Sequence, residues 1–115
     1  MTDCVFCRIA SGEIPATIVR RTPEAVAFRD LTPQAPTHLL IIPTRHLAAV
    51  RDARDPADQA ELGRLLQFAT EVATELGLDE GGYRLVTNTG KHGGQSVFHL
   101  HFHLLGGRPL GWPPG

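Results

Sequence analysis

The apolar residues in the middle of the chain recur at helical spacing. Over residues 56–76 they form one face, made up of Leu62, Leu65, Leu66, Ala69, Val72, Ala73 and Leu76. Asp55 followed by Pro56 is typical of a helix N-cap and first helical position, and Gly77 is typical of the left-handed residue that stops a helix. The pattern therefore predicts one long helix with both ends marked.

The first part of the chain predicts a short helix and a hairpin. A helix over residues 4–10 would end at Ser11 and Gly12. Apolar residues over 16–21 and over 25–29 flank the turn sequence TPE, which indicates two strands joined by a short turn.

Three more strands complete the prediction. Residues 38–42 are mostly apolar and predict a buried strand that Pro43 ends. Residues 83–88 and 96–105 predict two strands joined by a glycine-rich loop over 90–95. Strands with short connections and one long helix predict an α+β domain around a mainly antiparallel sheet.

Size and charge narrow the class of protein. A chain of 115 residues with 42% hydrophobic residues fits a single domain over 1–115. A formal net charge of −1 gives no basic field for a nucleic acid polymer. The apolar runs are too short to span a bilayer, and the N-terminal residues do not form a signal peptide. We therefore expect a cytoplasmic protein with no membrane partner.

The sequence GGQSVFHLHFHLLGG places His99, His101 and His103 at alternate positions of the last predicted strand. Alternation sends these side chains to one face, about 6 to 7 Å apart, and the apolar residues between them to the other. A lone histidine is usually an ordinary polar or hydrogen-bonded residue. A row suggests either a metal site or covalent catalysis by one imidazole. The glycine turn, Gln95 and Ser96 resemble a cradle for phosphate oxygens, which favours catalysis.

The row HLHFHLL matches the signature of the histidine triad (HIT) superfamily at every position. The segments EIPA, AFRDLTPQAPTHLLIIP, GGQSVFHLHFHLLGGR and WPPG further resemble its Hint branch, over nearly the whole chain. This resemblance implies a HIT-like fold with a five-stranded sheet, one long helix and a short N-terminal helix. It also implies purine nucleoside phosphoramidase activity and a homodimer whose two sheets join.

The resemblance implies catalytic roles for particular residues. His101 matches the nucleophile, which attacks the α-phosphorus of the substrate and forms a nucleotidyl-histidine intermediate. His103 matches a phosphate contact, and His99 and His38 match histidines that support the nucleophile. Ser96 matches a residue near the leaving group.

A second set of residues matches nucleotide contacts. Asp30, with Leu31 beside it, matches the residue that binds the ribose hydroxyls, which suits a carboxylate because it can accept two hydrogen bonds. Asn88 matches a ribose and phosphate contact, and Gly94 and Gln95 match phosphate-loop positions. The slot for the purine base matches four apolar residues, Val5, Phe6, Ile9 and Phe28.

Cys4 and Cys7 form a C-x-x-C pair whose spacing alone leaves three readings open: half a zinc site, a redox pair, or two reduced thiols. In the resemblance, His46 and His99 match the positions that complete a Cys₂His₂ zinc site with them. A closed four-ligand zinc would be structural, so we expect no cofactor to be required for the chemistry.

Other functions remain open from the sequence. A dinucleoside polyphosphate hydrolase uses the same triad, although the short chain and its WPPG end weigh against it. A nucleotide-binding or scaffold protein with little turnover would tolerate loss of His101. A zinc hydrolase with the triad as ligands would lose activity on chelation. His92 in the glycine loop matches no role.

Overall fold

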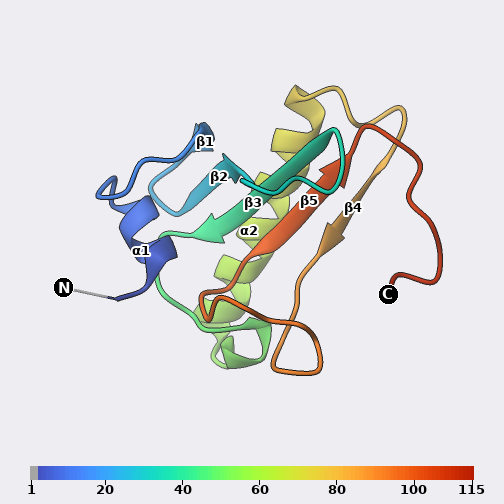
Figure 1. Cartoon of the computed structure of the whole chain (residues 1–115). Helices are drawn as coiled ribbons and strands as arrows, with labels where there is room; N and C mark the ends of the chain where they lie inside the picture. Colours follow the sequence, from blue (N-terminus) through green and yellow to red (C-terminus); the bar gives the residue numbers. More distant parts are fainter. Residues whose placement is uncertain (1–2) are drawn as a thin grey trace.

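The structure is a computed structural model, in which residues 3–115 are described. In chain order these residues form helix α1 (Val5–Ala10), strands β1 (Ile18–Arg21), β2 (Ala25–Arg29) and β3 (Thr37–Pro43), the short 3₁₀ helix η1 (Val50–Asp52), helix α2 (Pro56–Glu75), and strands β4 (Tyr83–Val86) and β5 (Phe102–Gly106) (Figure 1). The α+β class expected from the sequence is confirmed.

The strands form one antiparallel sheet in the order β1-β2-β3-β5-β4. Helix α2 lies along one face of this sheet, and α1 lies on the opposite side near β2 and β3 (Figure 1). Strands β1 and β4 are its two edges. Among residues 3–115, no helix is both long enough and apolar enough to cross a membrane.

Alternation along β3 explains why its sequence is almost continuously apolar. Leu39 and Ile41 pack into a core with α2, whereas Leu40 and Ile42 pack into a second core with α1. Both faces of the central strand are therefore covered. His38 has the same parity as Leu40, so its side chain lies on the α1 side of the sheet.

The ends of α2 follow the predicted signals. The Asp55 carboxylate accepts the backbone N–H of Asp58 at 2.8 Å, and Gly77 follows the helix with φ +74°. The predicted apolar face was wrong at one position, because Leu66 is 37% exposed. Phe68, absent from the prediction, is buried instead, since it lies one turn after Leu65 on the face that meets the sheet.

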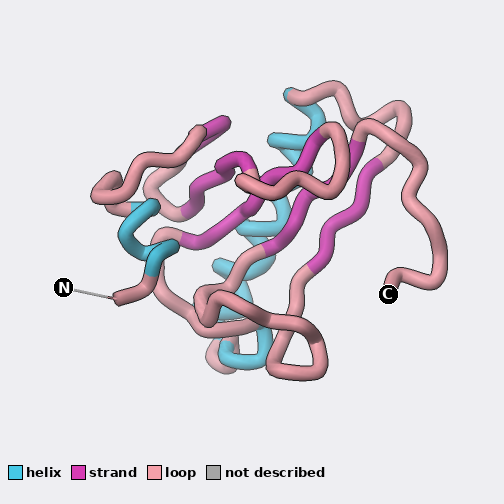
Figure 2. Tube along the Cα trace, in the orientation of Figure 1, coloured by secondary structure: helices cyan, strands magenta, loops and turns pink. Residues whose placement is uncertain are grey.

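The last two predicted strands were too long. Strand β4 ends at Val86 rather than residue 88, and β5 begins at Phe102 rather than residue 96. Figure 2 shows the connection between β4 and β5 as loop. The last residue pair between β3 and β5 joins Ile41 to Phe102, because Pro43 has no N–H to continue the ladder. His99 and His101 therefore lie on irregular backbone.

Smaller differences concern the first strands. Strand β1 begins at Ile18 instead of residue 16, and its register shifts by a bulge between Ile18 and Arg20. Strand β3 is one residue longer at each end than predicted. The chain after β5 runs back beside β4, where Arg84 Nη2 donates a 2.8 Å hydrogen bond to the carbonyl of Gly111.

Candidate active site and metal cluster

His101 is held with one ring nitrogen protonated. Its Nδ1 lies 2.8 Å from the carbonyl oxygen of His99, and a carbonyl can only accept, so Nδ1 carries the proton. The neutral ring then has its lone pair on Nε2. The ring is 6% exposed and makes edge contacts with Phe6, at 5.1 Å between centroids, and with His103, at 5.2 Å. The fold thus prepares a nucleophilic nitrogen in a fixed orientation.

A second hydrogen-bonded arrangement, which we call the histidine series, joins Gln34, His38 and His103. The backbone N–H of Gln34 donates to His38 Nδ1 at 3.0 Å. The proton of the His38 ring is therefore on Nε2, which lies 2.8 Å from His103 Nδ1 and donates to it. His103 then keeps its own proton on Nε2. The histidine series ends in an N–H donor, which suits contact with an anionic oxygen.

Burial keeps the histidine series neutral. It lowers the pKa of His38, against the opposing negative charge of Asp30, whose Oδ2 lies 3.5 Å from His38 Nε2. Burial also lowers the pKa of His103, helped by the neighbouring His101 and His38 and opposed by Asp30. Both rings therefore remain neutral near pH 7, as their hydrogen bonds require.

A pocket of about 280 Å³ opens beside these histidines. Its lining includes the four residues predicted for the base slot, Val5, Phe6, Ile9 and Phe28, and the two predicted at the ribose, Asp30 and Leu31. Phe6 and Phe28 meet edge to face with centroids 5.6 Å apart, and Leu31 is 98% exposed. Phe6 therefore lines the apolar pocket and also contacts the His101 ring.

The glycine loop between β4 and β5 has a constrained backbone. Gly94 adopts φ +83°, and a Cβ at Gly93 would collide with the carbonyl of Thr89. Gly94 and Ser96 are exposed, whereas Gln95 between them is buried. Its side chain hydrogen-bonds within the protein.

Asn88, the remaining predicted contact, is half-buried just beyond β4. Its neighbour Thr87 donates a 2.9 Å hydrogen bond from Oγ1 to the carbonyl of His101. This contact was not foreseen from the sequence. It fixes the backbone at His101 from the side of β4.

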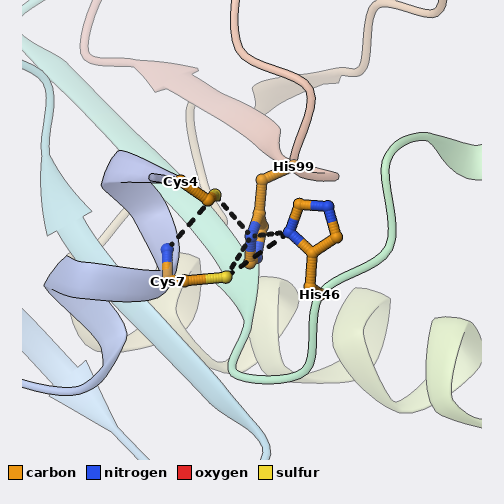
Figure 3. Close-up of side chains that lie close together, drawn as sticks. All are labelled: Cys4, Cys7, His46 and His99. Atoms are coloured by element: carbon orange, nitrogen blue, oxygen red, sulfur yellow. Dashed lines mark hydrogen bonds between the residues drawn. The ribbon is translucent and has the colours of Figure 1, made fainter. Parts of the chain in front are cut away.

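Figure 3 shows four side chains that lie close together, which we call the metal cluster: Cys4, Cys7, His46 and His99. His99 Nδ1 lies 3.3 Å from Cys4 Sγ, 3.4 Å from Cys7 Sγ and 3.2 Å from His46 Nδ1. The distance from Cys7 Sγ to His46 Nδ1 is 3.4 Å. Four soft or borderline ligand atoms thus surround one point.

The metal cluster fits a zinc ion. In a tetrahedron, zinc bonds of about 2.0–2.1 Å to nitrogen and about 2.3 Å to sulfur separate a ligand nitrogen from another nitrogen or from a sulfur by about 3.3–3.6 Å. The four observed separations of these two kinds are 3.2–3.4 Å. His99 Nε2 donates to the carbonyl of Pro43 at 2.9 Å, so its Nδ1 lone pair faces the ion's position. Burial lowers the pKa of His99, which favours the neutral form that binds metal.

Asp30, His38 and His103 also bring possible ligand atoms within 4.8 Å of one another. They do not fit a metal, however. His38 Nδ1 accepts from Gln34, so the His38 nitrogen that faces the group holds a proton and offers no lone pair. The distances between ligand atoms therefore do not show which of the two groups can bind a metal, whereas the proton positions on the histidine rings do.

Local structure explains how the metal cluster assembles. Cys4 is the N-cap of α1 and its sulfur accepts the N–H of Cys7 at 3.4 Å, so the helix start brings both thiols to one side. His46 is exposed in the connection after β3. The preceding Arg45 binds Glu61 at 2.8 Å and also Asp58, both on α2, which anchors this connection.

The backbone partners of the histidines left no signal in the sequence. Gln34, Pro43 and His99 act through main-chain atoms, which every residue type supplies apart from the N–H that proline lacks. Arg45 was also missed, although an arginine directly before a candidate ligand, with acidic residues at helix positions 58 and 61, could have indicated an anchor.

Comparison with known proteins gives concordant matches. A family model described as the HIT domain matches residues 11–110. The purine nucleoside phosphoramidase of Escherichia coli (strain K12) is 50% identical over 109 residues, covering 95% of this chain and 91% of that protein. The crystal structure of a HIT family hydrolase from Legionella pneumophila matches with a TM-score of 0.94 and 53% identity, covering 98% of this chain and 100% of that one. A histidine triad protein from Clostridium difficile has a TM-score of 0.92 and 39% identity, with 96% of each chain covered.

Proposed function

This chain belongs to the HIT domain family, and from that premise we propose that it hydrolyses the P–N bond of purine nucleoside 5′-phosphoramidates. The observation that carries the chemistry is the 2.8 Å hydrogen bond from His101 Nδ1 to the His99 carbonyl, which leaves the lone pair of the neutral ring on Nε2 to act as the nucleophile. The His101 ring contacts Phe6, which lines an apolar pocket. The likeness to the Escherichia coli phosphoramidase supplies the substrate class.

The reaction takes two displacements at phosphorus. In the first, His101 Nε2 attacks the α-phosphorus, the P–N bond to the amine breaks, and its electron pair leaves with the amine, which takes up a proton. Water then attacks the nucleotidyl-histidine, releasing the nucleoside monophosphate and restoring the ring. Direct attack by water on the P–N bond is thus replaced by attack of the more nucleophilic imidazole and then by attack of water on an intermediate with a better leaving group. His103 Nε2–H donates to a phosphoryl oxygen, and Ser96 lies beside the leaving amine.

The nucleotide occupies the pocket with its base among the apolar residues and its ribose hydroxyls on Asp30. Phe6 and Phe28 offer aromatic surfaces to a purine. The phosphate lies between His101 and the glycine loop that carries Gly94, Gln95 and Ser96, with Asn88 near the ribose. The contacts of two pocket-lining residues support this placement, because Phe6 lies against the His101 ring and Asp30 lies 3.5 Å from His38.

We further propose that the metal cluster holds a structural zinc ion. Bound zinc would join α1, the connection after β3 and the backbone before His101 without taking part in the displacement. The ligand separations and the His99 tautomer support this assignment. No cofactor is required by the two displacement steps themselves.

The proposal also includes a homodimer in the cytoplasm. Strand β4 is an edge of the sheet, so two copies could pair along it into one continuous sheet. A thiolate metal site suits a reducing compartment. Light scattering with the zinc-loaded protein would test the dimer directly, and a single monomer mass over the micromolar range would contradict it.

Hydrolysis of adenosine 5′-phosphoramidate by the wild type, His101→Ala and His92→Ala tests the function. His92 is an exposed histidine of the glycine loop and serves as the matched control. We expect AMP release by the wild type and by His92→Ala, and a loss of at least about 10³-fold in kcat for His101→Ala. Turnover should survive a zinc chelator while the protein stays folded.

Two results would contradict the proposal. Equal turnover by His101→Ala would exclude histidine as the nucleophile. Tight binding of AMP by the wild type without release of product from the phosphoramidate would indicate a nucleotide-binding protein instead of an enzyme.

A further inference from the structure

Gln95 differs from the rest of the glycine loop because it is only 8% exposed while its neighbours Gly94 and Ser96 face solvent. Its Oε1 accepts the backbone N–H of Gly90 at 2.9 Å. Its Nε2 donates to the carbonyl of Ala48 at 2.6 Å and to that of Val97 at 3.2 Å. One buried amide therefore contacts three separate points of the backbone.

These contacts use every donor that Gln95 has. A glutamine side chain carries two N–H donors, and both are directed at carbonyl oxygens of the protein. The backbone N–H of Gln95 also donates to the carbonyl of Gly90 at 3.0 Å. Gly90 and Gln95 thus close the loop with two reciprocal hydrogen bonds, and no donor of Gln95 faces a phosphate.

The contact with Ala48 ties the loop to the frame of the catalytic histidine. Ala48 follows Leu47, whose carbonyl accepts the backbone N–H of Leu100 at 2.6 Å. Leu100 directly precedes His101. The same short stretch of backbone, residues 47–48, therefore holds both the glycine loop and the segment that carries the nucleophile.

We propose that Gln95 is a positioning residue that acts on the phosphate through the loop. By closing the turn at Gly90 and fixing it to Ala48, it sets where Gly94 and Ser96 present their polar groups relative to His101. This inference rests on the proposed function, since it assigns the glycine loop to the phosphate. A small shift of the substrate phosphorus away from the nucleophilic nitrogen lowers the reaction rate strongly, so the position of the loop affects the rate as well as the binding of the phosphate.

The test compares Gln95→Met with Gln67→Met. Methionine keeps the length of the side chain and removes its hydrogen bonds, and Gln67 is an exposed glutamine on α2. We expect Gln95→Met to bind AMP about 10-fold more weakly and to bind adenosine within about 2-fold of the wild type, because adenosine lacks the phosphate. Calorimetry measures both, and Gln67→Met should leave both unchanged.

Hydrogen exchange without nucleotide separates positioning from direct contact. The Gly90 amide is bonded to Gln95 Oε1, so its exchange should be slow in the wild type and at least about 10-fold faster in Gln95→Met. AMP binding that weakens while Gly90 exchange stays unchanged would make Gln95 a direct ligand and overturn the inference. Unchanged AMP binding in Gln95→Met would overturn it as well.

A milder variant covers the case in which Gln95→Met fails to fold. Gln95→Asn keeps the amide but is one methylene too short to reach Gly90 and Ala48 together, so it should also weaken AMP binding selectively over adenosine. An unchanged ratio of the two affinities would overturn the inference. If the wild type itself binds AMP no more tightly than adenosine, the phosphate site of the proposed function fails, which is a different outcome.

Discussion

The metal cluster and the histidine series lie on the same side of the sheet and look alike by distance alone. In each, a histidine nitrogen lies about 3 Å from another ring nitrogen, at 3.2 Å in the metal cluster and 2.8 Å in the histidine series. They differ in the partner of the second ring nitrogen. His99 donates from Nε2 to a carbonyl and so offers a lone pair, whereas His38 accepts from an N–H and so offers a proton. The hydrogen-bond partner of one ring nitrogen therefore decides whether the other nitrogen can bind a metal or can donate a hydrogen bond.

The largest effect should follow from removing a sulfur ligand of the metal cluster. Serine in Cys4→Ser still provides an N-cap acceptor for α1, so the helix start is kept while the sulfur ligand is lost. We expect more than about 100-fold weaker zinc binding, measured by competition with a chromogenic chelator. His38→Ala, in the histidine series, should bind zinc as the wild type does. Equal zinc affinity in both variants would erase the distinction between the two groups.

Loss of the His38 side chain should lower the catalytic rate and leave zinc binding unchanged. Without the His38 N–H, His103 Nδ1 loses its donor, so nothing keeps the His103 proton on Nε2. We expect kcat for adenosine 5′-phosphoramidate to fall about 10²-fold in His38→Ala, with zinc content unchanged. A variant that lost zinc but kept its kcat would reverse the two assignments.

Removing the contacts that anchor the connection at His46 should weaken zinc binding by a smaller amount. Arg45→Gln removes the contacts with Glu61 and Asp58 and should loosen the connection that carries His46. We expect about 10-fold weaker zinc binding. The control is Arg64→Gln. Arg64 lies on α2, as Asp58 and Glu61 do, but its two 2.8 Å hydrogen bonds go to Glu24, in the turn before β2, and not to the connection that carries His46. Similar losses in both variants would indicate a general effect on α2.

The smallest effect concerns pH. His38, His99 and His103 have lowered pKa values in the folded protein, chiefly because of burial. The unfolded chain, with histidine pKa values of about 6.5, binds protons first as pH falls, so these groups lower the free energy of unfolding below about pH 6.5. Urea unfolding with a zinc chelator at about pH 7.5 and 5.5 measures the change, since carboxylates titrate lower. The decline should be shallower in His103→Asn, and equal slopes would contradict the assignment.

Local signals in the sequence predicted the framework of the fold well. The ends of α2 depend on Asp55, Pro56 and Gly77, whose effects act within one turn of helix. The start of β5 was wrong because it depends on a distant residue. Pro43 lies on a different strand, and its missing N–H ends a ladder that the sequence near Phe102 gives no reason to end.

The chemistry was predictable by residue type and not by proton position. The sequence supplied the histidines and the two cysteines, and the structure brings Cys4, Cys7, His46 and His99 together as expected. It also brings the predicted base-slot residues into one pocket. Which nitrogen of each ring holds the proton depends on main-chain groups, which nearly every residue type supplies, so no motif could report it. The buried position of Gln95 was hidden for the same reason, since its side chain bonds to main-chain groups of Gly90, Ala48 and Val97.

The atoms that set the three ring tautomers belong to the main chain, namely the carbonyls of Pro43 and His99 and the amide of Gln34. Side-chain replacement at these positions leaves those atoms in place, except where proline is introduced at position 34. Saturation mutagenesis of this chain would therefore detect the histidines but not the main-chain groups that set their tautomers. Exchanging the Gln34 amide for an ester by chemical synthesis would delete one such group and leave every side chain intact.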